Sequence, residues 1–209
     1  MSLHLPSFLA ILLSYLLGSL SFAVIVSRSM GMADPRSYGS GNPGATNVLR
    51  SGNRGAALAT LLLDALKGWV PVFAIRIAGP DFGMGAGTAA LAGFAAFLGH
   101  LYPVFFGFQG GKGVATAAGV LLGVDWLLGL ATGTTWAIVA FFFRYSSLAS
   151  LAAAFFAPAF YVIGSGIAWA FDRTVLGALV AMSLLLVWRH RENIRRLAAG
   201  TESRLGGRK

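Results

Sequence analysis

The sequence contains no cysteine, and it has few charged residues. The absence of cysteine excludes disulfide bonds, thiolate nucleophiles and cysteine-ligated zinc or iron–sulfur sites. Charged residues make up 11% of the chain, against about 25% in a typical soluble domain. Because 56% of the 209 residues are hydrophobic and the mean hydropathy is +0.74, this scarcity of charge indicates an integral membrane protein.

Acidic residues are also too few and too scattered in the sequence to indicate a metal site. The seven are Asp34, Asp64, Asp81, Asp125, Asp172, Glu192 and Glu202. Magnesium and calcium need several oxygen ligands around one ion. This spacing argues against a metal-dependent phosphotransferase, and we expect neither a metal nor a cofactor. In addition, neither His100 nor His190 is followed by an aspartate five residues later, so the HxxxxD pair of thioester-using acyltransferases is missing.

Long apolar runs predict membrane-spanning helices, since a span needs about 20 predominantly apolar residues. The first run, residues 5–26, has no basic stretch before it and exceeds the apolar core of a signal peptide, so we predict a retained span. Residues 114–143 are long for one crossing and short for two, and Asp125 interrupts them. The other predicted spans are residues 55–78, 84–106, 148–168 and 174–188.

Basic residues decide how often residues 114–143 cross, because they gather near the cytoplasmic ends of spans. They are concentrated in two places, with Arg28, Arg36, Arg50 and Arg54 after the first span, and Arg189, Arg191, Arg195, Arg196, Arg204, Arg208 and Lys209 in the tail. Both groups face the cytoplasm only if two helices form, at residues 114–124 and 127–143. We therefore predict one all-α membrane domain over residues 1–209, a bundle of seven spans, some short or re-entrant. Its N-terminus is outside and its C-terminus cytoplasmic. This topology explains the net charge of +9 without nucleic acid.

A first glycine-rich polar segment, GSGNPGATNVLR, covers residues 39–50. Glycines let backbone N–H groups turn toward an anion, hydroxyl and amide side chains add donors, and an arginine can donate two hydrogen bonds to one phosphate. The alternative is a flexible cytoplasmic loop whose arginine follows the positive-inside rule. We favour a phosphate site because all these features occur together. The candidate residues are Ser40, Gly41, Asn42, Thr46, Asn47 and Arg50.

A second such segment, GFQGGKGVAT, covers residues 107–116. Its lysine lies among glycines just before a predicted helix, where free N–H groups and the helix dipole favour an anion. It is not a Walker A loop, because Phe106 stands in place of the first glycine and Gly113 in place of the serine or threonine after the lysine. A tight interfacial turn with a snorkelling lysine is the alternative. The candidates here are Gly110, Gly111, Lys112 and Thr116.

Two further polar groups lie near the ends of predicted spans. His190 and Asn193 are three residues apart on one predicted helix face, where the last span meets the cytoplasm. A basic interfacial helix that binds anionic lipid is an equally good interpretation of that segment. Ser147 and Ser150 lie at the start of the sixth span, where they serve either as hydrogen-bond donors to a substrate or as helix caps.

Three segments, in this order, resemble the signature segments of the bacterial acyl-phosphate:glycerol-3-phosphate acyltransferases: GSGNPGATNVLR, GHLYPVFFGFQGGKGVAT and RHRENIRRLAAGTES. The segments RYSSLAS and DALKG match as well, and DALKG contains Asp64 and Lys67, which we interpret as a structural pair inside the second span. The resemblance implies a seven-span fold without metal or CoA. It also implies transfer of a long-chain acyl group from acyl phosphate to the sn-1 hydroxyl of glycerol 3-phosphate, the first step of phospholipid synthesis, with lysophosphatidic acid and phosphate as products.

The resemblance also implies which residues act. Catalytic roles fall on Arg50, Lys112, His190 and Asn193, and the other candidates contribute to the substrate site. The glycerol 3-phosphate hydroxyl would attack the acyl carbonyl directly, without an acyl-enzyme, and His190 would position substrate or help to move the proton. We expect a multi-pass protein of the bacterial inner membrane, in contact with membrane lipid, whose active site faces the cytoplasm.

A transporter of a phosphorylated metabolite is the alternative function. It too would use basic, glycine-rich breaks in its helices. Discontinuous transporter helices usually come as paired repeats that bind near the membrane midplane. The two glycine-rich segments of this chain differ from each other and lie at the predicted cytoplasmic boundary, which favours the enzyme.

Overall fold

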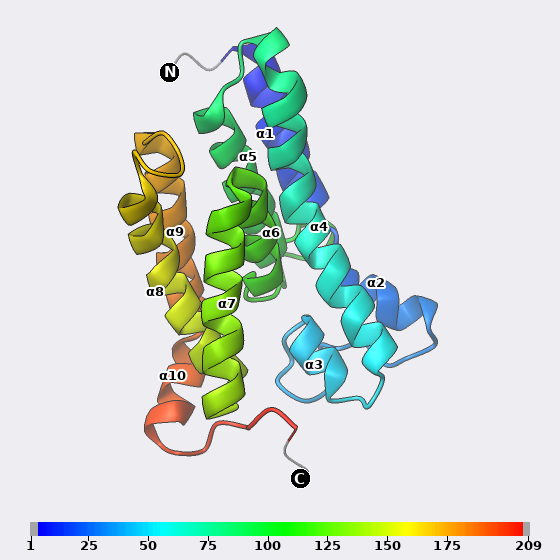
Figure 1. The fold of residues 1–209 in the computed structure, drawn as a ribbon. Coiled ribbons are helices and arrows are strands. Elements are labelled where there is room, and N and C mark those ends of the chain that lie inside the picture. Colours follow the sequence, from blue (N-terminus) through cyan, green and yellow to red (C-terminus); the bar gives the residue numbers. More distant parts are fainter. Residues whose placement is uncertain (1–3, 207–209) are drawn as a thin grey trace.

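The structure, a computed structural model, describes residues 4–206 and is built from helices (Figure 1). The predicted all-α class is confirmed; an isolated bridge joins Ser165 to Trp169. Arg208 and Lys209, which belong to the basic tail considered above, lie outside the described residues. The helices are α1 (Leu5–Gly18), α2 (Phe22–Ser29), α3 (Ala45–Leu49), α4 (Arg54–Ala78), η1 (Gly79–Phe82), α5 (Ala86–Leu101), η2 (Val104–Phe106), α6 (Val114–Val124), α7 (Trp126–Phe143), α8 (Ser146–Gly164), α9 (Arg173–Arg189) and α10 (Arg191–Ala198).

The first predicted span is not one straight helix. Residues 19–21 separate α1 from α2, and the two axes differ by 44°. Gly18, at the end of α1, packs so closely on α5 that a Cβ there would lie 2.1 Å from the Ala96 carbonyl oxygen. At the break, the Leu20 carbonyl accepts a 2.6 Å hydrogen bond from the Lys67 side chain on α4. α1 thus ends at its close contact with α5, and after the break the chain continues into α2 and then α3.

Residues 114–143 form two helices that turn at Asp125, whose carboxylate caps α7 by accepting a hydrogen bond from the N–H group of Leu127 (2.8 Å). α6 has 11 residues and α7 has 18, so at 1.5 Å per residue they are about 16 Å and about 27 Å long. Because α6 ends and α7 begins at this turn, and the two helices pack on each other, α6 starts about 10 Å short of the far end of α7. Residues 107–109 are exposed, whereas Gly110, Gly111 and Gly113, next to the start of α6, are buried.

The other helices follow the predicted spans with shifted ends. α4 and α9 agree with residues 55–78 and 174–188 to within one residue at each end. α5 stops at Leu101 rather than at residue 106, since Pro103 disfavours the helical conformation at the residue before it. α8 stops at Gly164 rather than at residue 168. The chain turns there, and the isolated β-bridge between Ser165 and Trp169 follows before α9.

Four helices among residues 4–206 are each long and apolar enough to cross a membrane: α4, α5 with η2, α7 and α8. Two bent pairs, α1 with α2 and α9 with α10, reach the required length only together, and the second pair is bent by 56°. α6 is too short to cross by itself. The number of seven crossings and their orientation therefore stay predictions.

Helix α5 forms the centre of the bundle, with α1, α4, α6 and α9 packed around it. Small residues let these backbones approach closely. A Cβ on Gly99 of α5 would lie 2.3 Å from the Tyr15 carbonyl oxygen of α1, and a Cβ on Gly119 of α6 would lie 1.9 Å from the Ala65 carbonyl oxygen of α4. Such contacts are typical of helices packed in lipid, and they account for much of the glycine in the sequence.

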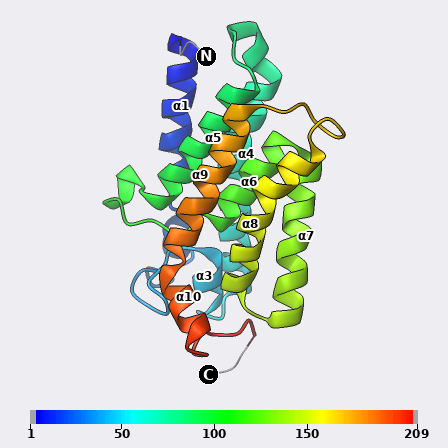
Figure 2. The ribbon, with the colours of Figure 1, turned by 90° about the vertical axis from the view of Figure 1, so that its left-hand side faces the viewer.

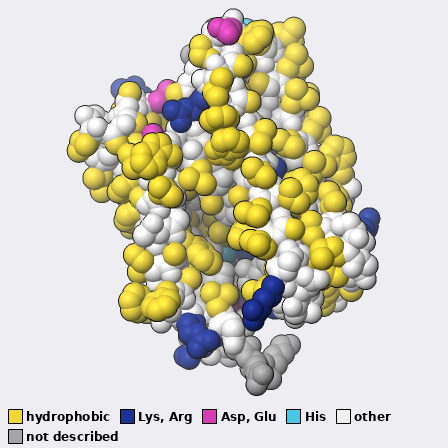
Figure 3. All heavy atoms as spheres, turned by 45° about the vertical axis from the view of Figure 1, so that its right-hand side comes forward, with side chains coloured by type: hydrophobic (Ala, Val, Ile, Leu, Met, Phe, Trp, Pro, Cys, Tyr) yellow, Lys and Arg dark blue, Asp and Glu magenta, His cyan; other side chains and the backbone are white. Residues whose placement is uncertain are grey.

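Apolar side chains cover most of the flank of the bundle, with basic side chains near both of its ends (Figure 3). Leu62, Phe141, Phe155 and Leu184 are each more than half exposed, which suits a lipid environment rather than water. The loop between α2 and α4, helix α10 and the C-terminal tail lie together at the end opposite the N-terminus (Figures 1 and 2). The segments that carry the predicted site residues therefore meet at one end of the molecule.

Candidate active site

The first glycine-rich segment is held in shape by Asn47, on α3. Its side-chain nitrogen donates hydrogen bonds to the carbonyl oxygens of Pro35 (2.6 Å) and Tyr38 (3.1 Å), and its Oδ1 accepts one from the Ser40 N–H group (3.0 Å). Only 2% of Asn47 is exposed. The side-chain nitrogen and oxygen of Asn47 are therefore both used to fold the loop. The predicted residues Ser40, Gly41 and Asn42 lie on the exposed side of that loop.

Two side chains of this segment connect it to the other end of the sequence. The Arg50 guanidinium donates a 2.6 Å hydrogen bond to the Ser203 hydroxyl in the C-terminal tail. The Thr46 hydroxyl lies 3.4 Å from the Ser146 hydroxyl, at the start of α8. The predicted donors Arg50 and Thr46 thus point toward α8 and the tail.

The second glycine-rich segment is held by hydrogen bonds between its backbone groups and residues of α5 and α9. The Arg189 side chain donates hydrogen bonds to the carbonyl oxygens of Gly110 (2.7 Å) and Gly111 (3.1 Å). The Gly111 N–H group donates in turn to the His100 carbonyl oxygen at 3.1 Å. A Cβ on Gly110 would lie 2.1 Å from that same oxygen. Glycine is required here because the loop presses directly on the end of α5.

This loop directs Lys112 toward the third segment. The Lys112 amino group donates a hydrogen bond to Asn193 Oδ1, and the Asn193 side-chain nitrogen donates to Glu202 Oε1 (2.6 Å). The Glu202 carboxylate also accepts hydrogen bonds from the Ser147 hydroxyl (2.7 Å) and from Arg196 Nε (2.7 Å). The predicted residues Lys112, Ser147 and Asn193 therefore form one network around Glu202.

Sequence interpretation missed Glu202 as a member of the site. By spacing alone it is one of seven scattered acidic residues, although it lies in the GTES end of the third segment. These contacts join residues that are far apart in the sequence: Glu202 is 55 residues from Ser147, and Lys112 is 81 residues from Asn193. No local pattern therefore indicates them. The position of Glu202 within the third signature segment was the signal that could have identified it.

Burial and neighbouring polar and charged groups shift the pKa values of the ionisable side chains in this network. Burial, and then the positive charge of Arg196, lower the pKa of Lys112 to about 8. Burial favours the neutral form of Glu202, but hydrogen bonds from Asn193, Ser147 and Arg196 outweigh this effect and lower its pKa. At neutral pH the site therefore holds a charged but readily neutralised lysine beside an ionised carboxylate.

His190 lies at the bend between α9 and α10 rather than within one continuous helix. His190 and Asn193 therefore do not share the face of one continuous helix, as predicted, because the chain bends at His190. His190 is 2% exposed, and its Nδ1 lies 2.8 Å from the Leu186 carbonyl oxygen. A carbonyl oxygen only accepts, so Nδ1 carries the proton and Nε2 is left as an acceptor. Burial, only partly offset by that hydrogen bond, lowers the pKa of His190 to about 4 and keeps the ring neutral at pH 7.

Two predicted residues lie in helix interfaces outside this network. Thr116 is fully buried, and its backbone packs against Gly68 of α4. Ser150 accepts a 3.1 Å hydrogen bond from the Trp136 indole and donates one of 2.8 Å to the Ser146 carbonyl oxygen. Both residues join helices beside the site, and a direct role in substrate binding stays a prediction for each.

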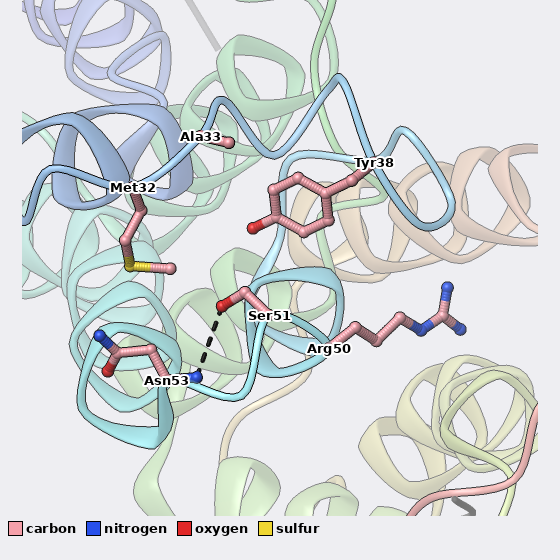
Figure 4. Close-up of a pocket in the computed structure, with 6 residues that line it drawn as sticks. All are labelled: Met32, Ala33, Tyr38, Arg50, Ser51 and Asn53. Atoms are coloured by element: carbon pink, nitrogen blue, oxygen red, sulfur yellow. Dashed lines mark hydrogen bonds between the residues drawn. The ribbon is translucent and has the colours of Figure 1, made fainter. Parts of the chain in front are cut away.

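A cavity of about 570 Å³ lies behind the first segment and is not the candidate active site itself. Its lining includes Met32, Tyr38, Ser51 and Asn53, and the Asn53 N–H group donates to the Ser51 hydroxyl at 3.4 Å (Figure 4). The Arg50 side chain extends away from this cavity (Figure 4). Arg50 thus forms part of the wall between the cavity and the site.

The arrangement is suited to binding anions at the edge of a lipid-embedded bundle. Four positively charged side chains, Arg50, Lys112, Arg189 and Arg196, come from three distant segments, and Glu202 compensates one of these charges. Such a cluster can hold phosphate groups and stabilise negative charge that develops during a reaction. Fold and site together define an integral membrane protein with a polar, basic cluster at one end of its helical bundle.

Comparison with known proteins narrows this class. Residues 8–200 match the family model described as "Glycerol-3-phosphate acyltransferase". The chain therefore belongs to the glycerol-3-phosphate acyltransferase family. It is 68% identical over 197 residues to the glycerol-3-phosphate acyltransferase of Albidiferax ferrireducens, covering 94% of this chain and 88% of that one. It is 63% identical over 202 residues to that of Burkholderia pseudomallei, covering 96% of both chains.

Two solved structures are similar over 96% of both chains. One is PlsY (YgiH), an integral membrane glycerol 3-phosphate acyltransferase, in its glycerol 3-phosphate form, with 38% identity and a TM-score of 0.87. The other is the lysophosphatidic acid form, with 37% identity and a TM-score of 0.85. These comparisons confirm the predicted family, the membrane-embedded helical fold and the assignment as an acyltransferase of phospholipid synthesis. They favour the enzyme over the alternative of a transporter.

Proposed function

We propose that the protein transfers a fatty acyl group from a long-chain acyl phosphate to the sn-1 hydroxyl of glycerol 3-phosphate. The products are lysophosphatidic acid and inorganic phosphate. Three sets of facts support this proposal: the family of the chain, the match of its three segments to those of acyl-phosphate-dependent enzymes, and the basic site. The solved relatives are described in glycerol 3-phosphate and lysophosphatidic acid forms, which are the acceptor and the product of this reaction.

The observation that carries the proposal is the meeting of three distant basic segments at one end of the bundle. Arg50 contacts Ser203 in the tail, and Lys112 contacts Asn193 after the last long helix. The outer surfaces of the surrounding helices are apolar. A substrate with a phosphate headgroup and a fatty tail satisfies both environments, because its headgroup binds the basic side chains while its tail stays among apolar groups.

The proposed reaction needs no covalent intermediate on the protein. The sn-1 hydroxyl oxygen forms a bond to the acyl carbonyl carbon, and the bond from that carbon to the phosphate oxygen breaks. The hydroxyl proton passes to the departing phosphate, which is both a good leaving group and a base. The protein mainly orients two anionic substrates and offsets their mutual repulsion.

The side chains divide this work according to their chemistry. Arg50 and Lys112 bind the glycerol 3-phosphate headgroup, since each carries positive charge into the site. Asn193 and Glu202 orient Lys112 from the opposite side. His190 is neutral, and its Nε2 is an acceptor that can hold the attacking hydroxyl in place. This assignment gives His190 a positioning role rather than that of a strong base.

We propose further that the site faces the cytoplasm of a bacterial inner membrane. The basic segments lie at one end of the bundle, together with the C-terminal tail (Figures 1 and 2). Excess lysine and arginine marks the cytoplasmic side of bacterial membrane proteins. This orientation gives the site direct access to glycerol 3-phosphate, which is soluble in water.

A donor-exchange assay tests the proposed function. Purified protein is incubated with glycerol 3-phosphate and either palmitoyl phosphate or palmitoyl-CoA, and lysophosphatidic acid and inorganic phosphate are measured. We expect product only with palmitoyl phosphate, at one phosphate released per lysophosphatidic acid. Product from palmitoyl-CoA alone would overturn the proposed donor. Uptake of glycerol 3-phosphate into protein-containing liposomes without any acyl donor would favour transport instead.

A further inference from the structure

A buried cluster of three ionisable side chains lies between α4 and α5, outside the network around Glu202. Asp64 Oδ1 is 2.8 Å from Lys67 Nζ and 3.5 Å from His100 Nδ1. The three side chains are between 1% and 7% exposed. A charged group at membrane depth costs about 2.5 to 3.5 kcal/mol on insertion scales. Pairing Asp64 with Lys67 would offset that cost, so the contact with His100 needs a further explanation.

One arm of the cluster reaches the break in the first span. Lys67 Nζ donates a 2.6 Å hydrogen bond to the Leu20 carbonyl oxygen, and it lies 5.6 Å from the centre of the Phe22 ring at the start of α2. This break redirects the chain into α2 and the loop that leads to Arg50. The cluster therefore helps to set where the first glycine-rich segment begins.

The other arm reaches the second glycine-rich segment. The His100 ring lies directly against Gly111, since a Cβ added to Gly111 would lie 2.2 Å from His100 Nε2. The Gly111 N–H group also donates to the carbonyl oxygen of the same histidine at 3.1 Å. The next residue is Lys112. The His100 ring thus packs against the Gly111 peptide, and this peptide positions Lys112.

On the basis of the proposed function, we propose that Asp64 and His100 are positioning residues for glycerol 3-phosphate binding. Asp64 Oδ1 lies 3.5 Å from His100 Nδ1, a packing contact rather than a hydrogen bond, and it fixes one side of the ring. The ring packs against Gly111 and so sets the position of Lys112. The contact of Lys67 with Leu20 ties the same carboxylate to the chain that leads to Arg50. Through these contacts the buried Asp64 carboxylate sets the distance between Arg50 and Lys112, the two residues that we propose bind the phosphate.

The effect of losing this support is expected to be large for one substrate only. A displacement of about 1 Å in a positioning group can cost about 100-fold in activity. The Gly111 peptide has no side chain of its own to hold it, and Arg189 binds it only through two carbonyl oxygens. Removing the His100 ring therefore moves Lys112, which we propose binds glycerol 3-phosphate. The acyl tail does not depend on this loop.

The experiment compares His100→Ala, His100→Gln and the double variant Asp64→Asn with Lys67→Gln. The double variant removes both charges together, so no buried charge is left unpaired. For each purified protein, KM is measured separately for glycerol 3-phosphate and for palmitoyl phosphate. The rise in unfolding temperature on adding glycerol 3-phosphate alone gives a second readout of binding. We expect KM for glycerol 3-phosphate to rise about tenfold or more in His100→Ala and in the double variant.

The same variants should leave KM for palmitoyl phosphate within about twofold. His100→Gln should recover part of the loss, because its amide can reach the space beneath Gly111. Asp125→Ala is the matched control: it removes a helix cap at the opposite end of the bundle and should lower stability without changing either KM.

Several results would overturn the inference. These are an unchanged KM for glycerol 3-phosphate, equal changes in both KM values, or the same KM shift in Asp125→Ala. Failure of all the His100 and Asp64 variants to fold would assign the cluster to stability alone and would also overturn it. If the unmodified protein does not use palmitoyl phosphate, the proposed donor fails, while the thermal shift with glycerol 3-phosphate still tests the positioning role.

Discussion

The two ends of the helical bundle use their polar side chains in different ways. At the end that carries the N-terminus, acidic side chains cap helices within their own sequence. Asp125 accepts a hydrogen bond from the N–H group of Leu127, and Asp172 accepts one from that of Thr174 at 2.7 Å. These contacts join residues two positions apart and satisfy the free N–H groups of α7 and α9.

At the opposite end, the polar side chains of the candidate site bind partners from distant parts of the chain. Lys112 and Asn193 are 81 residues apart, and Arg50 and Ser203 are 153 residues apart. Local caps mainly stabilise single helices, whereas these distant contacts assemble a site from separate segments. Substitutions at the first end should therefore lower stability, and substitutions at the second should lower activity first.

The largest effect is expected from Lys112→Ala and Arg50→Ala. Each removes a positive charge that we propose binds phosphate, so we expect kcat/KM to fall by about 10²- to 10³-fold. Activity is measured with palmitoyl phosphate and glycerol 3-phosphate, and folding is followed by the unfolding temperature. A variant that folds normally and keeps activity within tenfold of the parent would remove that residue from the site.

Glu202→Gln should have the next largest effect. The change removes the charge that Arg196 contacts at 2.7 Å and weakens the hold on Asn193. Loss of such a supporting partner typically costs about 10- to 100-fold in activity, and the unfolding temperature should fall as well. Glu192→Gln is the matched control, because Glu192 is 57% exposed and contacts Arg191 and Arg195 at the surface. Equal behaviour of the two variants would contradict the role of Glu202.

The pH dependence of glycerol 3-phosphate binding should reflect Lys112. Its pKa is lowered to about 8, so the amino group loses its charge as the pH rises above that value. KM for glycerol 3-phosphate should therefore be constant near pH 7 and rise by up to about tenfold per pH unit well above pH 8. Lys112→Arg, which stays charged, should remove this rise even if it lowers kcat. A KM that is constant from pH 7 to pH 9.5 in the parent would contradict the prediction.

The smallest effect on function is expected at the end that carries the N-terminus. Asp125→Ala and Asp172→Ala each remove an N-cap, which costs about 1 kcal/mol, or about 2 to 4 °C in unfolding temperature for a chain of this size. Activity of the folded protein should not change. A clear loss of kcat/KM in either variant would show that the two ends are coupled more strongly than their contacts indicate.

Much of the architecture could be predicted because its causes act over short stretches of sequence. Apolar length indicates where helices occur, and the predicted ranges of α4 and α9 agree with the structure to within one residue at each end. Several glycines together with polar side chains and one lysine or arginine marked the two segments. The limits of this approach appear where one helix packs on another, since Gly18 ends α1 against Ala96 and the sequence around it looks continuous.

The sequence by itself determined the all-α membrane class and the family, and it pointed to Lys112, Ser147 and Asn193, which the structure brings into one network, because hydrophobicity and short motifs are local properties. Only the tertiary structure decided that Glu202 organises Lys112 and Asn193, that His190 lies at a kink, and that the His100 ring supports the second glycine-rich segment. These features depend on contacts between segments that are far apart in the chain. Such contacts exist only once the helices have packed, and no pattern within a single segment records them.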